Sequence, residues 1–389
     1  MASFLIAKLF PPRRLVGSLG LVLLLMVWVA GCDMDIDYRP QATGPKEQIT
    51  VVTDSTHWNG AIGDGIRDNI TPHITTLPQP ERAFETEHAQ LVSDRILDNV
   101  KTRRNVVFIE PLNANTPTAE FLREELSEDV HEAVRDGETV IVPREDFWRQ
   151  DQRAYLITAN TEEQLVEALD EHGPRIQTTF HEATLDRMHL DMFEKGRQPE
   201  LEDSLMESHD FAVNMQHDYR VAADTTNFVW LRRVLPDTRR EMWIHYIDDA
   251  DPGKISTDWI NAQRDSLNQR YLRGTLDGFK QTDYRRPLDA NETNFLGRFG
   301  YETRGLWYMV GETEDGSLVQ HGSGGPFVNY TFYDRATDRI YMIEGMVFAP
   351  DYGKRDFLRQ MEVIAHSFRT AEEVRDDADD EESLAQRDP

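Results

Sequence analysis

Three histidines and two aspartates lie close together in one predicted helical stretch, and side chains of these types bind transition metals. A zinc pair on a helix needs ligands about one turn apart, whereas His181 and His189 are separated by about two turns. His181-Glu182 is also not followed by a histidine at the spacing of the zinc-protease motif. We therefore expect solvated histidines, no metal site and no cofactor. The five residues are His172, His181, Asp186, His189 and Asp191.

A serine in a glycine-rich segment is the best candidate for a nucleophile. Ser323 lies in residues 322–328 (GSGGPFV), which resemble the segment around the nucleophile of trypsin-like proteases. Such an enzyme needs a histidine base oriented by a buried carboxylate, and backbone N–H groups that bind the oxyanion. Gly322 stands where that family has aspartate, and no upstream segment resembles its histidine segment. We expect a glycine-rich turn leading into a strand, and we assign no catalytic residue.

Tryptophans offer a third kind of chemistry, because their rings can line a binding cleft. Trp230, Trp243, Trp259 and Trp307 fall in predicted strands and in one predicted helix. Aromatic side chains in such elements usually belong to the core. We expect Trp307 and Tyr308 to be the exceptions, because their strand has loop-rich neighbours.

Cys32 is the only cysteine of the chain, and its surroundings predict lipidation. Residues 1–31 carry three basic residues and no acid, and an apolar run from Leu15 to Ala30 follows the basic residues. This is the organisation of a secretory signal peptide. The run ends in VAGC, which resembles the bacterial lipobox, whose cysteine receives diacylglycerol. We expect a lipid anchor with palmitate on Cys32 that holds the protein at a membrane without spanning it.

The chain is strongly acidic, which excludes one class of partner. It has 42 Lys and Arg against 70 Asp and Glu, a net charge of −28. Such a protein is not expected to bind nucleic acid. Only seven of the 42 basic residues are lysines and the other 35 are arginines, which together with the acid excess indicates adaptation to high salt.

The mature chain is long enough for two domains. We place an N-terminal α/β domain at residues 47–208 and a C-terminal α+β domain at residues 209–369. A flexible tether at residues 32–46 precedes them, and a disordered acidic tail at residues 370–389 follows them.

Apolar periodicity predicts the elements of both domains. In the first, strands are expected at 48–53, 105–109, 138–142 and 155–158, and helices at 58–70, 120–134 and 161–193, the last interrupted at Gly173-Pro174. In the second, aromatic and β-branched runs predict strands at 228–232, 241–247, 303–310, 326–333 and 339–348, with a hairpin turn at 334–338 and helices at 257–272 and 355–368. The fold class is therefore α+β, with two sheet-plus-helix domains, the second mainly antiparallel.

Several segments together resemble a known family. They are the lipobox, VVTDSTHW, NFVWLRR, RDSLNQRYLRG, ETRGLWYMV, GGPFVNYTFYD, RIYMIEGMVFAP and RQMEVIAHSF. They are similar to a family of lipoproteins from Bacteroidota and relatives that is catalogued as a domain of unknown function. The resemblance covers residues 48–368 and implies an envelope role without assigned catalytic residues. The closing strands and helix also show a weaker likeness to the Mog1 and PsbP type of α/β/α sandwich.

These observations favour a membrane-anchored envelope lipoprotein with a non-enzymatic role, in which it binds an unknown envelope protein or helps assembly. The outer membrane is the favoured location, and the sequence does not distinguish its two faces. Two alternatives stay open, an envelope serine hydrolase that uses Ser323 and a solute-binding lipoprotein.

Overall fold

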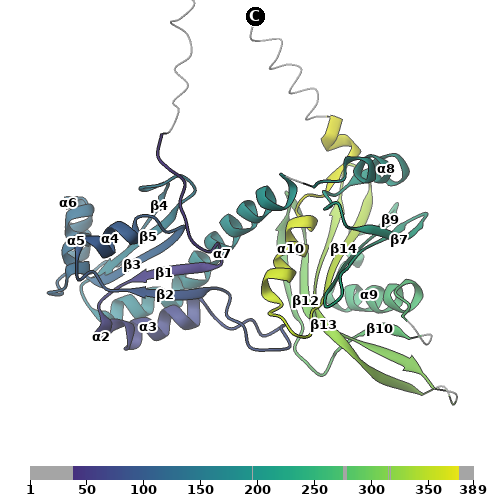
Figure 1. The fold of residues 1–389 in the computed structure, drawn as a ribbon, viewed down its shortest axis with the longest axis horizontal. Helices are drawn as coiled ribbons and strands as arrows, with labels where there is room; N and C mark the ends of the chain where they lie inside the picture. Colours follow the sequence, from purple (N-terminus) through teal and green to yellow (C-terminus); the bar gives the residue numbers. More distant parts are fainter. Residues whose placement is uncertain (1–37, 195, 275–277, 314, 316, 376–389) are drawn as a thin grey trace, which may run out of the picture. The chain divides into compact units, whose positions relative to one another are not determined.

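A five-stranded and an eight-stranded sheet, each with packed helices, form the described part of the chain (Figure 1). The structure is a computed structural model that describes residues 38–194, 196–274, 278–313, 315 and 317–375. The predicted α+β class with two sheet-plus-helix parts is confirmed, and the second sheet is antiparallel as expected. Within these residues, no helix is both long and apolar enough to cross a bilayer. Cys32 and the predicted signal peptide lie outside the described residues.

The five-stranded sheet is doubly wound and mainly parallel. Its strands are β1 (Gln48–Val52), β2 (Glu85–Ala89), β3 (Asn105–Pro111), β4 (Val140–Glu145) and β5 (Arg153–Ala159), in the order β2-β1-β3-β5-β4 with only β4 antiparallel. One face packs on α2 (Ser55–Trp58), α3 (Ala61–Gly65), the π-helix η1 (Ile66–Ile70) and α7 (Glu162–Phe193). The other packs on α4 (Asp94–Val100), α5 (Pro117–Glu125) and α6 (Glu128–Arg135). Because helices cover both faces, central strands such as β3 are buried along their whole length.

Helix α7 continues through the predicted break. A capping box at Thr161 and Gln164 starts the helix, and Pro174 lies inside it. Leu169 before the proline and Ile176 after it are buried in the same core, so packing holds both halves in line. A Cβ on Gly173 would lie 2.5 Å from the Asn69 side chain, so the glycine allows the close approach to η1. The Gly-Pro pair therefore marks a helix contact here and not a helix end.

The eight-stranded sheet is antiparallel throughout. Its strand order is β10-β12-β13-β14-β9-β8-β7, and β11 also pairs with β12. The helices α8 (Pro199–His209), α9 (Thr257–Tyr271) and α10 (Arg355–Ala365) accompany it, and a two-stranded sheet joins β6 (Phe211–Ala212) to β15 (Arg369–Thr370). The strands are β7 (Arg220–Thr225), β8 (Phe228–Val234), β9 (Arg239–Asp248), β10 (Phe279–Thr282), β11 (Asp289–Phe295), β12 (Arg298–Glu312), β13 (Leu318–Asp334) and β14 (Arg339–Phe348).

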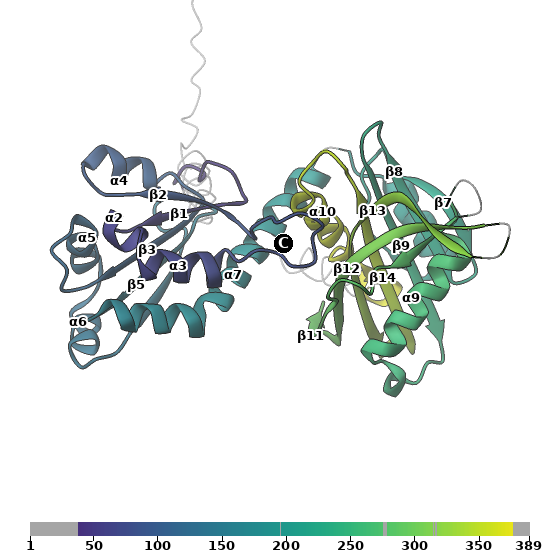
Figure 2. The same cartoon turned by 90° about the horizontal axis from the view of Figure 1, so that it is seen from below.

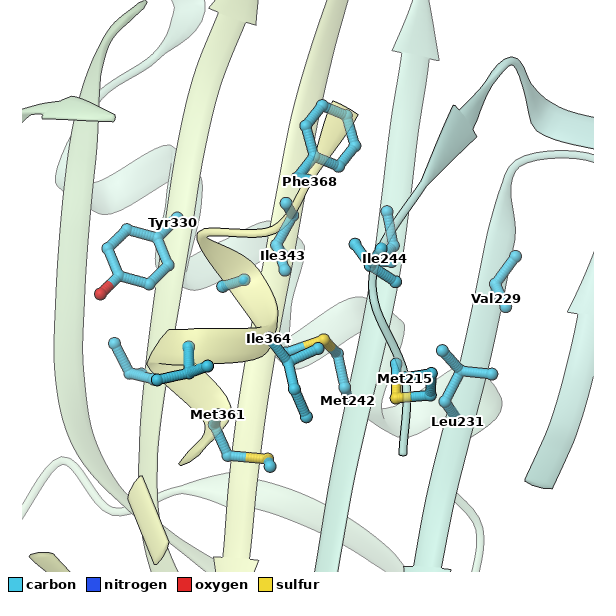
Figure 3. Packing of buried hydrophobic residues seen from close by; sticks show 14 of the residues in the cluster. Met215, Val229, Leu231, Met242, Ile244, Tyr330, Ile343, Met361, Ile364 and Phe368 are labelled. Atoms are coloured by element: carbon cyan, nitrogen blue, oxygen red, sulfur yellow. The ribbon is translucent and has the colours of Figure 1, made fainter. Parts of the chain in front are cut away.

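The two faces of this antiparallel sheet pack against different helices. Side chains alternate along each strand, so Met242 and Ile244 face α10, whereas Trp243 faces α9. Figure 2 shows the two helices on opposite sides of the sheet. The α10 face is an aliphatic and aromatic core, part of which is drawn in Figure 3, and it also buries charged side chains such as Arg240 of β9 and Glu362 of α10. The opposite surface, called the α9 face below, mixes aromatic rings with buried charges.

Several predicted boundaries are corrected. The single helix expected at 120–134 is two helices, α5 and α6, because Leu126 turns into the core with an extended backbone and Ser127 begins a new helix. The tether predicted at 32–46 already packs from Gln41 onward, and Ala42 is buried. The tail predicted at 370–389 begins with order, since Thr370 pairs in β15 and residues 371–375 are helical; residues 376–389 lie outside the described part. The hairpin turn at 334–338 is confirmed.

Candidate functional site

The α9 face carries an ion pair deep in its interior. Arg264 of α9 and Glu344 of β14 both have fully buried side chains (0% exposed), and Arg264 Nη2 donates to Glu344 Oε1 at 2.9 Å. The guanidinium lies 3.5 Å from the centre of the Phe327 ring; Arg264 Nε also donates to the carboxylate, and Asn329 donates a third hydrogen bond to it. Burying these two charges costs desolvation energy, which their mutual attraction and their hydrogen bonds offset.

A cavity of about 450 Å³ opens on the same face, where β8, β9, β10 and β13 lie near the end of α9. It is called the basic cavity below, because most of its charged side chains are cationic. Its lining residues are Trp230, Arg232, Arg239, Glu241, Leu272, Arg273, Gly274, Lys280, Met309, His321 and Ser323.

Strand register brings these side chains together from distant parts of the sequence. Glu241 on β9 lies opposite Arg232 on β8, and Arg239 occupies the same face two residues before Glu241. Lys280 reaches Glu241 from β10 and forms an ion pair with it, although the two residues are 39 positions apart. The site thus depends on the pairing of the strands and not on a local motif.

Burial and neighbouring charges set the ionisation of this pair. Burial lowers the pKa of Lys280 and outweighs the opposing effect of Glu241, and the nearby Arg239 and Arg232 lower it further. Burial alone would raise the pKa of Glu241, but the charge of Lys280 and its hydrogen bond hold that pKa below the ordinary value. Glu241 is therefore the anion of the pair.

Two indole rings in or beside the cavity already contact cations. The Lys280 ammonium lies 4.5 Å from the centre of the Trp307 ring, and the Arg232 guanidinium lies 4.7 Å from that of Trp230. Such contacts stabilise a desolvated cation by up to about 2 kcal/mol. Trp307 is buried, so its expected role as an accessible exception is wrong, and Trp230 lines the cavity instead. Tyr308, the other expected exception, is half-buried next to Gln281.

Ser323 reaches the cavity through a bulge. On β12, Met309 lies opposite His321, whereas the preceding residue, Tyr308, lies opposite Gly324. Gly322 and Ser323 therefore have no partners on β12. The glycine-rich segment is therefore an irregularity inside the 17-residue β13 and not the expected turn before a strand. Among the described residues, no hydrogen bond joins the Ser323 hydroxyl to a histidine base, so the arrangement of a serine protease is not seen.

The predicted helix histidines have different surroundings, and the expectation that all are solvated is wrong. His181 Nε2 lies 2.7 Å from the buried Glu362 carboxylate, which also binds Arg304. His189 is partly buried, and burial lowers its pKa. His172 fits the expectation and lies at the surface. Across the described residues, no group of three or more His, Cys, Asp or Glu side chains is arranged to hold a metal ion.

A second polar cluster lies at the carboxyl ends of β1 and β3 in the doubly wound sheet. The buried Glu110 carboxylate accepts hydrogen bonds from the Thr53 hydroxyl at 2.7 Å, the Asp54 backbone at 3.1 Å and the Thr116 hydroxyl at 2.9 Å. His57 Nδ1 lies 2.9 Å from the same carboxylate. Through these hydrogen bonds, Glu110 connects β3 to the end of β1, to α2 and to the start of α5.

The sequence analysis did not single out the Lys280–Glu241 pair or Glu110. Lys280 and Glu241 were not singled out, because a single lysine in FKQT and a single glutamate in RREMW have no distinguishing local pattern. One usable signal was present, since three consecutive charged residues, Arg239, Arg240 and Glu241, directly precede the apolar run of β9 where a buried strand was expected. For Glu110, the signal was a carboxylate at the end of a fully apolar strand.

Comparisons with known proteins match two parts of this chain to families of unknown function. Residues 42–193 match a family model described as a domain of unknown function (DUF8532), and residues 198–367 match another described as a domain of unknown function (DUF4837). The expected resemblance to a family without assigned function is confirmed at this level. A search of curated proteins found no match.

Similar solved structures include the Ran-binding protein Mog1p of Saccharomyces cerevisiae. It is 9% identical with a TM-score of 0.28, over 42% of this chain and 90% of that one. A Mog1 mutant is also 9% identical with a TM-score of 0.28, over 42% of this chain and 91% of that one. A protein of Bacteroides thetaiotaomicron is 10% identical with a TM-score of 0.21, over 41% of this chain and 45% of that one. The expected Mog1-like architecture of the closing strands and helix stays a prediction.

Proposed function

We propose that this chain is a membrane-anchored binding protein that holds a small anionic solute in the basic cavity. The observation that carries the proposal is the charge of the lining. Arg232, Arg239, Arg273 and Lys280 are cationic, and among the described residues the lining holds one carboxylate, Glu241. The chain as a whole has a net charge of −28, so the positive charge of this lining is opposite in sign to the charge of the whole chain.

The chemistry of these cations indicates an oxyanion. A guanidinium presents paired N–H donors that match the geometry of a carboxylate or a phosphate. The cavity volume, about 450 Å³, is in the range of small-molecule sites. Because Lys280 and Arg232 already lie against the rings of Trp307 and Trp230, charge and not ring stacking supplies the attraction. These features favour the solute-binding alternative over the binding of a partner protein.

The membrane anchor is a separate part of the proposal and rests on the sequence. Cys32 follows a basic and then apolar leader with a lipobox-like end, so we propose that it carries the lipid and places the protein in the cell envelope, with the outer membrane favoured. Anchoring would keep the binding site close to a membrane surface, where an exported protein meets solutes that enter the envelope.

A serine hydrolase is the second candidate, and one observation favours it. Ser323 lines the basic cavity together with His321. A fluorophosphonate probe that labels the native protein but not Ser323→Ala would establish this alternative and overturn a purely binding role.

Anion binding is tested by melting the full chain in increasing inorganic phosphate, with potassium chloride at the same ionic strength as the reference. A ligand at one hundred times its dissociation constant stabilises the native state by about 2.7 kcal/mol. Arg239→Gln should weaken phosphate binding at least about tenfold, since a charged hydrogen bond contributes roughly 1.5–3 kcal/mol. Arg95→Gln, at an exposed arginine of α4, is the matched control and should leave binding unchanged. If phosphate and succinate both leave the melting temperature at the chloride value, the proposal is wrong.

A further inference from the structure

Lys280 combines three properties that an ordinary surface lysine lacks. Its side chain is buried, its ammonium group pairs with the buried Glu241, and it lines a cavity that also presents Arg232 and Arg239. Most lysines that only solubilise a protein extend into water, where the amine is protonated and strongly hydrated. Lys280 instead lies where a bound solute would meet its amine.

We propose that Lys280 forms an imine with the carbonyl carbon of an anionic aldehyde or 2-oxo acid held in the basic cavity. This inference rests on the proposed anion binding, because the arginines would hold the carboxylate or phosphate of the solute while its carbonyl group faces Lys280. It adds that the ligand carries a carbonyl group and that one lysine binds it covalently.

The reaction balances with the groups present. The Lys280 ammonium releases a proton to solvent water, and the free amine then attacks the carbonyl carbon, so that a C–N bond forms and the carbonyl electron pair moves to oxygen. That oxygen takes up protons and leaves as water while the C=N bond forms. The net change is one ammonium and one carbonyl giving one protonated imine and one water, without any oxidant or reductant.

The surroundings favour this chemistry over simple ion pairing. Burial, helped by the two arginines, lowers the pKa of Lys280, which increases the fraction of free amine near neutral pH. Glu241 is a hydrogen-bonded carboxylate with a lowered pKa, so it stays ionised and would stabilise the cationic imine by its charge. The Trp307 ring beneath the ammonium would also stabilise the cationic imine.

The low lysine content makes the test direct. The full chain is incubated with glyoxylate, which is both an aldehyde and a 2-oxo acid, and the imine is reduced with cyanoborohydride before peptide mass spectrometry. We expect modification of Lys280 to exceed that of the exposed Lys254 on the order of tenfold, because the bound anion is held next to the amine. Inorganic phosphate should suppress the Lys280 adduct and leave the Lys254 adduct unchanged. Acetaldehyde, which lacks the anionic group, should not prefer Lys280.

Two variants complete the design. Lys280→Arg keeps a cation beside Glu241 and removes the amine, so the selective adduct should vanish while the melting temperature shows whether the protein is folded. Lys254→Arg should retain the Lys280 adduct. If phosphate raises the melting temperature but Lys280 is modified no more than Lys254, the covalent role is wrong and anion binding stands. If phosphate neither stabilises the chain nor competes with glyoxylate, both the covalent role and the proposed function are wrong.

Discussion

The buried pair of Arg264 and Glu344 gives the most direct test of how the α9 face is stabilised. Arg264→Met removes the guanidinium and leaves the Glu344 carboxylate, which is fully buried, without its main partner. Breaking a buried pair in this way costs about 3–5 kcal/mol, because the remaining charge is desolvated and uncompensated. We expect the free energy of unfolding to fall by that amount in Arg264→Met.

The double variant Arg264→Met/Glu344→Met separates the cost of a stranded charge from the value of the pair. Both charges are then absent, so most of the lost stability should return. The recovery should stop about 1–2 kcal/mol short of the native protein, because Asn329 and Thr282 lose hydrogen-bond partners. Urea denaturation followed by tryptophan fluorescence is suited to the measurement, since Trp243 and Trp307 lie in the same core.

The exposed pair of Arg135 and Glu128 serves as the control. Its side chains are 61% and 71% exposed, so Arg135→Met should change the stability by no more than about 1 kcal/mol. The reasoning is refuted if Arg264→Met costs as little as this control, or if the double variant loses the full sum of the two single losses.

Three further predictions follow from other features. Gly325→Ala should destabilise the protein by about 1–3 kcal/mol, because its Cβ would lie 1.9 Å from a carbonyl of β14, whereas Gly322→Ala, with no atom within 4 Å, should be tolerated; equal melting temperatures would contradict this. Burial opposes ionisation of Glu362, but the charge of Arg304 outweighs it and holds the pKa well below its ordinary value near 4.5. This stabilisation is present above pH 4.5 and is lost as the pH falls through the folded-state pKa, so Glu362→Gln should flatten the acid limb of a stability–pH curve. Cys32→Ala should shift the protein out of the membrane fraction, and unchanged fractionation would rule out the lipid anchor.

Strands with strong internal patterns could be predicted from the sequence. The central strands β8, β9 and β14 are rich in aromatic and β-branched residues, and each was expected within a few residues of its observed bounds. The edge strand β2, with the sequence ETEHA, was missed because an edge strand needs no continuous apolar pattern and carries charges that discourage further pairing.

The basic cavity could not be predicted, because its residues meet only through strand pairing. The expected strand at 241–247 placed Glu241 at a strand end, but nothing local shows that β10 brings Lys280 beside it. The glycines before Pro326 were interpreted as a turn, since a bulge inside a strand and a turn before a strand use the same residue types. At Pro174 a helix break was expected, but the helix continues, because packing on both sides of the proline overrides its local preference.

The buried ion pairs of the antiparallel sheet have a consequence for how this protein can vary over evolutionary time. Among the apolar side chains of the α10 face, such as Ile244 and Ile343, one hydrocarbon can replace another of similar volume at a small cost in stability. On the α9 face, a change at position 264 is tolerated only with a matching change at position 344, and the same holds for positions 241 and 280. Among relatives of this chain, we therefore expect these pairs to be exchanged together or not at all.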